Sequence, residues 1–251
     1  MRFKDKVIII TGAGQGIGRA FAYSFAGEGA YVIIAEINEV NAKTVAKGIN
    51  DEGFKAEAIV TDVSDEDSVN KMVEAVLAKH GRVDILVNNA GILSTIKMKP
   101  FWDISVEEWD RFMAVNLRSM FLCCKAVVPV MKAHKKGKII NMSSGTVLIG
   151  RPYYLHYVTS KAGVIGFTRA MAREVGDWNI NVNAITPGAI KTEIPRETVS
   201  PEQAKAMIAQ QCIGRTATPQ DLLGTVMFLA SEEADFITGQ IINVDGGFHM
   251  Y

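Results

Sequence analysis

Short apolar runs alternate with longer amphipathic stretches along the whole chain. The apolar runs predict strands at residues 6–11, 31–35, 56–60, 85–88, 138–142, 181–185 and 240–244. The amphipathic stretches predict helices at residues 17–28, 39–51, 66–79, 106–135, 157–176 and 219–230. The strands do not alternate polar and apolar residues, so both of their faces are expected to be buried. The pattern predicts an α/β protein, a single domain over residues 1–251 with about seven parallel strands and helices on both faces.

The least regular stretch lies between residues 186 and 212 and contains Pro187, Pro195 and Pro201. No composition shift accompanies it, which argues against a domain boundary. We expect this segment to form a mobile flap over a binding site, and we call it the flap.

Composition narrows the classes of function. Lys plus Arg and Asp plus Glu number 27 each, so the formal charge is zero and neither nucleic acid nor an anionic membrane is an expected partner. Three cysteines without regular spacing and four scattered histidines indicate neither a disulfide framework nor a metal site. The chain enters a strand at once and shows no apolar targeting segment, so a cytoplasmic location is expected.

A glycine-rich turn follows the first predicted strand and opens the first predicted helix. Residues 11–18 read T-G-A-G-Q-G-I-G, which fits the pattern T-G-x-x-x-G-x-G. Glycines allow a phosphate to approach the backbone closely, and the helix N-terminus offers free N–H groups to the anion. A strand before the loop and a helix after it are the context that a dinucleotide site requires.

Glu36 ends the second predicted strand, 18 residues beyond Gly18. An acidic side chain at this place binds the two hydroxyls of an adenosine ribose. It also repels a 2′-phosphate, because two unit charges about 4 Å apart interact by about 4 kcal/mol at an effective dielectric of about 20. The next residues, Ile37 and Asn38, carry no compensating positive charge. The sequence therefore predicts NAD rather than NADP, with a merely solvated strand end as the alternative interpretation of Glu36.

Tyr157 and Lys161 are four residues apart on a predicted helix and so face the same side. A tyrosine with its ordinary pKa near 10 is a poor acid–base group at neutral pH. A neighbouring ammonium favours the phenolate and lowers that pKa. Such a pair also arises by chance on helices, so its meaning depends on the rest of the chain.

Several motifs occur together in the order and spacing of one family. They are the glycine loop, Asn88-Asn89-Ala90-Gly91, Asn116, Ser144, Tyr157-x-x-x-Lys161, and Pro187-Gly188. In these motifs the chain resembles the single-domain subgroup of the short-chain dehydrogenase/reductase family over residues 5–248. The resemblance implies a Rossmann-type, doubly wound sheet, an oxidoreductase activity with a nicotinamide cofactor, and a homotetramer.

The resemblance also implies catalytic roles. Tyr157 would be the general acid/base, and Lys161 would lower its pKa and hold the nicotinamide ribose. Ser144, which lies 13 residues before Tyr157, would donate a hydrogen bond to the substrate oxygen, with the adjacent Ser143 as the competing assignment. Asn116 would anchor a water that relays protons to Lys161, or alternatively would be a helix-distorting polar residue that bonds only to backbone.

Further residues are implied as cofactor contacts. The glycine loop and Glu36 would hold the adenosine diphosphate part, Asp62 and Val63 the adenine, and later residues the nicotinamide half. The full implied set is Gly12, Gln15, Gly16, Ile17, Gly18, Glu36, Asp62, Val63, Asn88, Ala90, Gly91, Tyr157, Lys161, Pro187, Gly188, Ile190 and Thr192.

The substrate pocket is expected beside Tyr157 and the flap. Candidate wall residues are mostly apolar or aromatic, which suits an alkyl or aryl-alkyl secondary alcohol and its ketone. They are Leu93, Thr146, Leu148, Tyr153, Tyr154, His156, Ile194 and Met207, with Arg151 and Arg196 as the basic residues that could lie near.

The motifs leave more than one function open. Dehydrogenases of secondary alcohols such as 1-phenylethanol share them with 3-oxoacyl-acyl-carrier-protein reductases, which commonly use NADP, a cofactor that Glu36 disfavours. A non-catalytic NAD-sensing protein and an S-adenosylmethionine-dependent methyltransferase also use a glycine loop and an acidic ribose contact. Neither has need of Tyr157 and Lys161.

Overall fold

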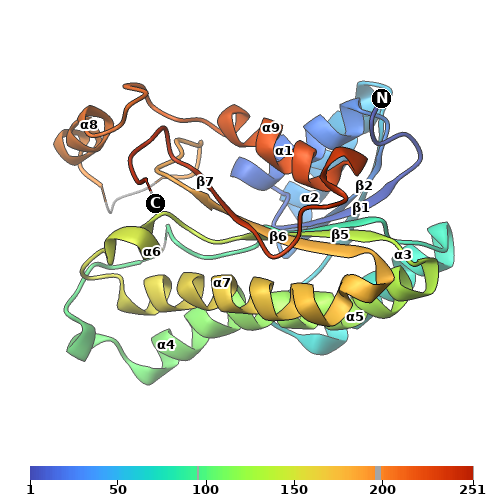
Figure 1. The fold of residues 1–251 in the computed structure, drawn as a ribbon, viewed down its shortest axis with the longest axis horizontal. Coiled ribbons are helices and arrows are strands. Elements are labelled where there is room, and N and C mark those ends of the chain that lie inside the picture. Colours follow the sequence, from blue (N-terminus) through green and yellow to red (C-terminus); the bar gives the residue numbers. More distant parts are fainter. Residues whose placement is uncertain (95, 196–198, 251) are drawn as a thin grey trace.

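The computed structural model describes residues 1–94, 96–195 and 199–250, so Arg196 lies outside the described residues. Its sheet contains seven parallel strands in the order β3-β2-β1-β4-β5-β6-β7 (Figure 1). The strands are β1 (Val7–Thr11), β2 (Tyr31–Glu36), β3 (Lys55–Val60), β4 (Ile85–Asn88), β5 (Gly137–Met142), β6 (Ile180–Pro187) and β7 (Ile241–Val244). The predicted single doubly wound Rossmann-type sheet is confirmed.

Helices cover both faces of this sheet (Figure 1). One face carries α1 (Gly16–Gly27), α2 (Glu39–Asp51) and α9 (Gln220–Ala230), and the other carries α3 (Glu66–His80), α5 (Ser119–His134) and α7 (Leu155–Val175). Shorter elements are η1 (Phe101–Asp103), α4 (Val106–Met113), η2 (Ala114–Arg118), α6 (Thr146–Ile149), η3 (Gly176–Trp178), α8 (Pro201–Ala209) and η4 (Glu232–Ala234).

The core explains why the strands lack alternation. Along β1, Ile8 and Ile10 pack into the cluster formed with α1, α2 and α9, while Val7 and Ile9 pack into the cluster on the opposite face. Each strand side is thus covered by a helix layer, and a polar residue on either side would be buried.

The sheet order reverses between β1 and β4. The chain leaves β1 toward β2 on one side, and β4 pairs with β1 on the other. Because all strands are parallel, their carboxyl ends meet at one edge, and the two diverging crossovers open a crevice there, where ligands bind in such sheets.

The helix predicted over residues 106–135 is interrupted at residues 114–118. A π-helical segment, η2, separates α4 from α5 and contains the buried Asn116. By length and composition alone, the stretch Val106–His134 could cross a membrane. Its buried side chains, including Leu122, Val127 and Met131, pack into the core beneath the sheet, which accounts for their apolar character.

The flap contains a helix that its irregular sequence did not predict. α8 begins with a capping box, in which Ser200 and Gln203 exchange side-chain and backbone hydrogen bonds, and Pro201 occupies its first turn. An isolated bridge pairs Ile190 with Ala217 at the other end of the segment.

Candidate active site

One cavity of about 890 Å³ lies at the carboxyl ends of the strands. Its wall includes Gly12 after β1, Glu36 at the end of β2, Ala90 after β4, Ser144 after β5 and Gly188 after β6. The crevice expected from the strand order is therefore the place where most of the predicted site residues meet.

The glycine loop is packed too closely for larger residues. A Cβ on Gly12 would lie 2.8 Å from Cα of Ala90, and a Cβ on Gly18 would lie 2.3 Å from the carbonyl oxygen of Gly12. Gln15, the N-cap residue of α1, makes no side-chain capping bond. A backbone cradle at an uncapped helix N-terminus fits a pyrophosphate.

Gly16 does not line this cavity, which corrects its expected cofactor contact. Its N–H donates to Oε1 of Glu193 at 2.8 Å, and Glu193 also pairs with Arg19 at 3.0 Å. The flap therefore covers Gly16, while Gln15, Ile17 and Gly18 line the cavity.

Glu36 is almost completely buried and lines the cavity. Its Oε2 accepts the N–H of Gly14 at 3.1 Å, and its Oε1 accepts the N–H of Asn38 at 3.0 Å. These bonds fix the carboxylate against the glycine loop and leave each oxygen a further lone pair for a ribose hydroxyl. The alternative interpretation of Glu36 as a solvated strand end is wrong.

The remaining expected cofactor contacts fall on both sides of the cavity. Asp62 and Val63 line it beside Glu36, and Asp62 is held by the N–H and hydroxyl of Ser64 at 2.9 and 2.7 Å. Lining residues on the far side are Ala90, Gly91, Pro187, Gly188, Ile190 and Thr192.

Asn88 is a correction to that set. It is buried within the sheet, and its Nδ2 donates to Oδ1 of Asn141 on β5 at 2.9 Å. Its neighbour Asn89 lines the cavity instead and ties the glycine loop down by donating to the carbonyls of Thr11 and Gly12, both at 3.0 Å. Asn88 supports the strand ends but does not face a ligand.

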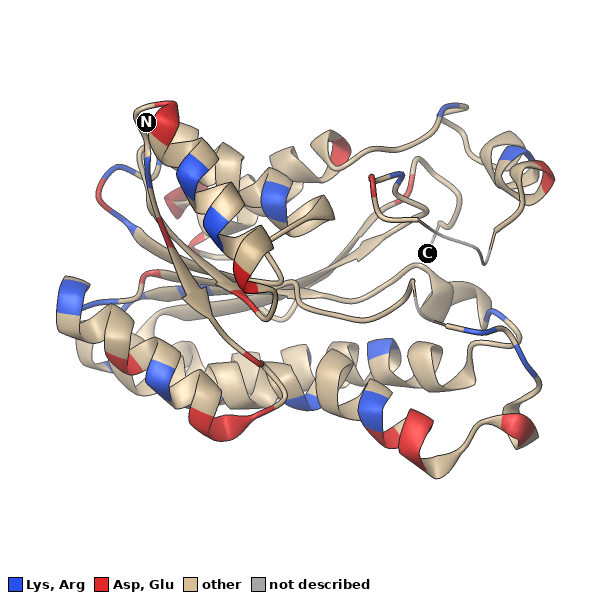
Figure 2. Ribbon diagram, turned by 180° about the vertical axis from the view of Figure 1, so that it is seen from behind, with Lys and Arg blue, Asp and Glu red and all other residues tan. Residues whose placement is uncertain are grey.

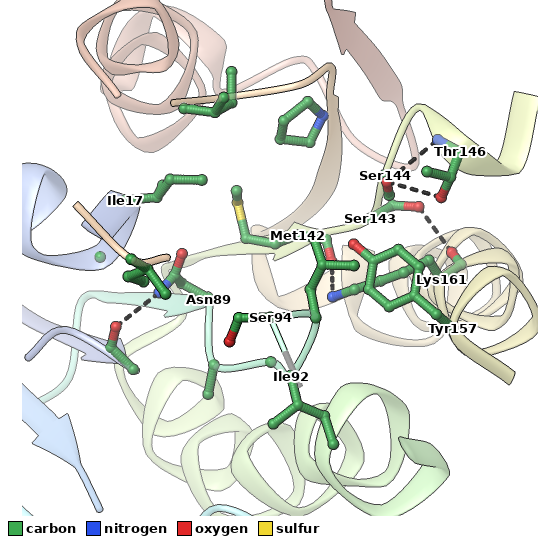
Figure 3. A pocket seen from close by; sticks show the side chains of 18 of the residues that line it. Ile17, Asn89, Ile92, Ser94, Met142, Ser143, Ser144, Thr146, Tyr157 and Lys161 are labelled. Carbon is green, nitrogen blue, oxygen red and sulfur yellow. Dashed lines mark hydrogen bonds between the residues drawn. The ribbon is translucent and has the colours of Figure 1, made fainter. Parts of the chain in front are cut away.

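Tyr157 and Lys161 lie on one face of α7, as their spacing predicted (Figure 3). Both are buried and line the cavity, and Nζ of Lys161 is 6.0 Å from the centre of the Tyr157 ring. Nζ donates to the carbonyl of Met142 at 2.9 Å, and burial lowers the pKa of the Lys161 ammonium to about 8. The pair places a phenol and a nearby ammonium at the inner wall of the cavity.

The two adjacent serines after β5 have different partners. Ser143 donates its hydroxyl to the carbonyl of Lys161 at 2.8 Å, so that proton is already used. Ser144 accepts the N–H and the hydroxyl of Thr146 at 3.2 and 2.9 Å, which leaves its own hydroxyl hydrogen for another acceptor (Figure 3). The geometry favours Ser144 over Ser143 as the hydrogen-bond donor to a bound oxygen.

Asn116 stands behind the cavity wall and is completely buried on η2. Its Oδ1 accepts the N–H of Ile92 at 2.7 Å, and its Nδ2 donates to the Ile92 carbonyl at 3.1 Å and to Ser160 at 3.4 Å. Asn116 thus fixes the segment that follows β4 and is not itself a lining residue. Its role as an anchor for a water stays a prediction.

The expected substrate wall is partly corrected. Leu93, Thr146, Ile194 and Met207 line the cavity, as does Arg151. Leu148 does not, because Thr146 and Ile149 share the cavity face of α6, three residues apart, and Leu148 points elsewhere.

Tyr154 is a second correction. It is completely buried in a cluster with Ile96, Phe112 and Tyr157, beneath the guanidinium of Arg151, and does not reach the cavity. The other two candidates, Tyr153 and His156, are also outside the lining.

Several lining residues were not foreseen. Ile92, Ser94, Met142 and Ile149 could have been suspected from their places beside the motifs. Gln211, Asp245, Phe248 and His249 come from the flap end and the C-terminal segment, and no local sequence signal places them at the site. Within the described ranges, no group of three or more His, Cys, Asp or Glu residues could hold a metal ion.

Comparisons with known proteins agree with this geometry. The sequence model of the family described as Enoyl-(Acyl carrier protein) reductase matches residues 12–249. A 3-oxoacyl-[acyl-carrier-protein] reductase of Thermotoga maritima is 40% identical, with 98% of this chain and 99% of the relative covered. A cyclopentanol dehydrogenase of Comamonas sp. is also 40% identical, with 98% of each covered.

Solved structures give the same result. A 3-oxoacyl-[acyl-carrier protein] reductase with bound NAD from Brucella melitensis has a TM-score of 0.91 at 32% identity and covers 100% of this chain and 93% of that one. A putative short-chain alcohol dehydrogenase from Sinorhizobium meliloti has a TM-score of 0.92 at 32% identity, covering 98% and 97%. The chain belongs to the short-chain dehydrogenase/reductase family, and it is an oxidoreductase that binds a nicotinamide cofactor.

Proposed function

We propose that this chain interconverts a secondary alcohol, of alkyl or aryl-alkyl type, and its ketone with NAD(H). The observation that carries the proposal is that Tyr157, Lys161 and Ser144 share one largely apolar cavity with the buried carboxylate of Glu36. An acid–base group, a hydrogen-bond donor for the reacting oxygen and a contact for a ribose are thus present in a single site.

Tyr157, Ser144 and Lys161 have separate roles in the proposed reaction. A nicotinamide cofactor held by these residues would supply the hydride for ketone reduction or accept the hydride in alcohol oxidation. Tyr157 gives the proton to the ketone oxygen, or removes it from the alcohol hydroxyl, which contributes roughly 10²–10⁴-fold. Ser144 donates a hydrogen bond to that same oxygen as negative charge develops on it. The ammonium of Lys161 favours the phenolate of Tyr157 in the oxidative direction.

Glu36 supports NAD as the cofactor. Both of its oxygens are fixed by backbone N–H groups, so the carboxylate cannot easily turn away from a ligand at this place. A 2′-phosphate would meet a like charge in a buried setting, where repulsion is stronger than in water.

The cavity wall supports the substrate class. Apolar side chains of Ile92, Leu93, Ile149, Ile194 and Met207 line the cavity with Tyr157, and the arginines in its wall are Arg111 and Arg151. Such a wall suits an apolar substituent on the alcohol carbon more than a carboxylate or a phosphate.

Reduction of a 3-oxoacyl thioester is a second candidate. It is supported by relatives of 37–40% identity that carry this name over nearly their whole length. A non-catalytic NAD-binding role has less support, because the Tyr157, Lys161 and Ser144 set is complete.

A substrate panel separates these possibilities. We expect purified protein to reduce NAD⁺ with cyclopentanol and 1-phenylethanol, and to oxidise NADH with the corresponding ketones, more efficiently than with an acetoacetyl thioester. A reversed preference would favour the reductase of acyl thioesters. No turnover with any of these compounds would contradict both candidates.

The role of Tyr157 has a matched control in the same helix region. Tyr157→Phe should lower kcat by roughly 10²–10⁴-fold while NADH binding is retained, because only the phenol proton is lost. Tyr154→Phe changes a buried neighbour outside the cavity and should keep turnover within a few-fold of the wild type. Equal losses in both variants, measured by steady-state kinetics, would show a packing effect rather than proton transfer.

Two further proposals concern the whole protein. We propose a homotetramer, supported by the exposed apolar side chains Trp102, Val106 and Phe121 on the layer that contains α4 and α5.

A cytoplasmic location is supported by the free state of the three cysteines, Cys123, Cys124 and Cys212.

A further inference from the structure

The C-terminal segment turns back into the cavity around one carboxylate. After β7, Gly246 and Gly247 adopt left-handed conformations, with φ of 70° and 77°, and reverse the chain. Asp245 accepts the N–H groups of Gly247, Phe248 and His249 at 3.0, 3.1 and 3.1 Å. The buried carboxylate thereby fixes the backbone of the segment that carries His249.

Asp245 also holds the imidazole of His249. The distance from Nδ1 of His249 to Oδ2 of Asp245 is 2.6 Å. Burial alone would raise the pKa of the Asp245 carboxyl, but hydrogen bonds from Asn243, His249 and the backbone outweigh it, and the pKa lies below its ordinary value. Because a carboxylate oxygen accepts, Nδ1 donates the hydrogen in this pair, and in that tautomer Nε2 is the acceptor of the ring.

The Nε2 atom of His249 is buried and has no hydrogen-bond partner among the described residues. The side chain lines the cavity, and its Cε1 lies 3.7 Å from the place where Gly145, next to Ser144, would carry a Cβ. A buried polar atom without a partner costs free energy, about 1–3 kcal/mol, unless a ligand or water completes it.

The other buried histidine nitrogens that lack a hydrogen-bond partner belong to His80 and His156. His80 and His156 do not line the cavity, and Nε2 of His156 lies 3.2 Å from a carboxylate oxygen of Glu108. His249 therefore combines, within the described part of the chain, a fixed ring, an unpaired nitrogen and a place in the wall near Ser144.

We propose that His249 is a specificity-determining residue, oriented by Asp245, whose Nε2 accepts a hydrogen bond from a donor group on the substrate. The donor is a second hydroxyl or an amide N–H on the substituent that lies away from the reacting carbon. This inference rests on the proposed function, because it concerns the substrate of the same site. Asp245 is a positioning residue in this arrangement, because it acts by holding the His249 ring.

Matched substrates test the donor requirement. The compounds are 1-phenylethanol, its 3- and 4-hydroxyphenyl analogues and the corresponding methoxyphenyl analogues, with acetamidophenyl and N-methylacetamidophenyl analogues as the amide pair. The wild type should prefer a donor-bearing compound over its methylated partner by about tenfold in kcat/KM, as one hydrogen bond predicts. The pair that shows the preference identifies the hydroxyl or the amide as the donor.

Variants of His249 separate recognition from packing. His249→Phe keeps a ring of similar size but no acceptor, and should reduce the donor preference, taken as the ratio of the kcat/KM values of the two paired compounds, to about one. His249→Gln retains an acceptor and should keep part of the preference. A preference that survives in His249→Phe, or an equal fall for donor and methylated compounds, would overturn the proposal.

A binding measurement makes the test independent of turnover. The chain contains four histidines, so the imidazole signals in a proton NMR spectrum can be assigned, that of His249 by its loss in His249→Phe. With NADH bound, the hydroxyphenyl or acetamidophenyl alcohol should shift the His249 signal, and the methylated partner should not. Absence of turnover with a selective shift would reject the proposed function alone, whereas absence of a selective shift overturns the role of His249.

Discussion

The fold buries Lys161 without a carboxylate partner among the described residues. Burial lowers its pKa from 10.5 to about 8, and its ammonium donates to the Met142 carbonyl. Below pH 8 the ammonium is charged in the folded and the unfolded chain, so folding bears the full cost of burying it. Above pH 8 the folded chain releases this proton before the unfolded chain does, and the cost disappears by about pH 10.5.

Lys161→Met should therefore be inactive but more stable than the wild type at pH 7, by about 1–3 kcal/mol, since the shift corresponds to roughly 3 kcal/mol before the lost hydrogen bond is counted. The difference should shrink as the pH rises from 8 to 10, because the wild type gains stability in that window. Denaturant unfolding at pH 7, 8, 9 and 10 measures it. Lys71→Met, at an exposed site on α3, should show no such trend, and a pH-independent gain in Lys161→Met would contradict this account.

Glu36 carries the cofactor prediction. Glu36→Gln removes the charge and keeps one oxygen, so the side chain can accept one of the two backbone N–H groups that hold Glu36. The ratio of kcat/KM for NAD⁺ over NADP⁺ should fall by at least about tenfold, because the repulsion of a 2′-phosphate is lost. Glu39→Gln, an exposed change at the start of α2, is the control and should leave the ratio unchanged. A wild type that already prefers NADP⁺ would contradict the electrostatic argument.

Individual residues show what a sequence can and cannot reveal. The helix repeat predicted that Tyr157 and Lys161 share one face, and the resemblance to the family implied their roles and that of Ser144. Tyr154 was misassigned because an aromatic residue near a site also suits the core beneath it. His249 was missed because its place depends on the left-handed Gly246 and Gly247, which turn the C-terminus back to a strand end far away in sequence.

At the scale of elements, close packing limits the size of the side chains that the glycine loop and the start of α1 can hold. Gly18→Ala would bring a Cβ to 2.3 Å from the Gly12 carbonyl and 2.5 Å from the Asn89 amide, so the loop must shift. We expect NADH affinity, measured by fluorescence titration, to fall by at least about tenfold and stability by about 1–3 kcal/mol.

Gly224 provides the matched control on another helix. It lies within α9, and a Cβ there meets nothing within 4 Å. Gly224→Ala should leave NADH binding unchanged and stabilise the protein by up to about 1 kcal/mol, as helix propensity predicts. Unaltered NADH binding in Gly18→Ala would contradict the tight-loop explanation.

The sequence predicted elements well where a single repeat of apolar residues runs through the whole element. It predicted them poorly where that repeat is interrupted. The strands follow from uninterrupted Ile and Val runs that need cover on both faces. A helix distortion at Asn116 was only an alternative interpretation of the sequence, because the bonds that accompany the π-helical turn join Asn116 to Ile92 across 24 residues. α8 was hidden because its capping box and first-turn proline lie in a segment rich in turn residues.

At the scale of the whole molecule, exposed apolar side chains on the layer of α4 and α5 include Trp102, Val106 and Phe121. Phe101 and Trp102 contact each other at 5.1 Å between ring centres, and Trp102 is 72% exposed. Figure 2 shows that acidic and basic residues are interspersed over the other helices rather than gathered into one basic face. This distribution favours self-association over binding to a polyanion.

Light scattering after size-exclusion chromatography should give a mass of about 110 kDa, four times the 27.4 kDa of one chain. Phe121→Glu, on α5, should shift the protein to a smaller species, because a charge would be buried in the interface. Val40→Glu, at an exposed site on α2, is the control and should remain tetrameric. A wild type that elutes as a monomer would contradict the assembly.

Two bonds cross between the end of β5 and α7: Lys161 donates to the Met142 carbonyl, and Ser143 donates to the Lys161 carbonyl. This seam joins the strand end that bears Ser144 to the helix that bears Tyr157, without help from the flap or the C-terminal segment. Laboratory evolution could therefore randomise Ile194, Met207 and His249 to change which alcohol is accepted. The relative positions of Tyr157, Lys161 and Ser144 should be kept in such variants. Libraries directed at the seam itself should instead yield mostly inactive protein.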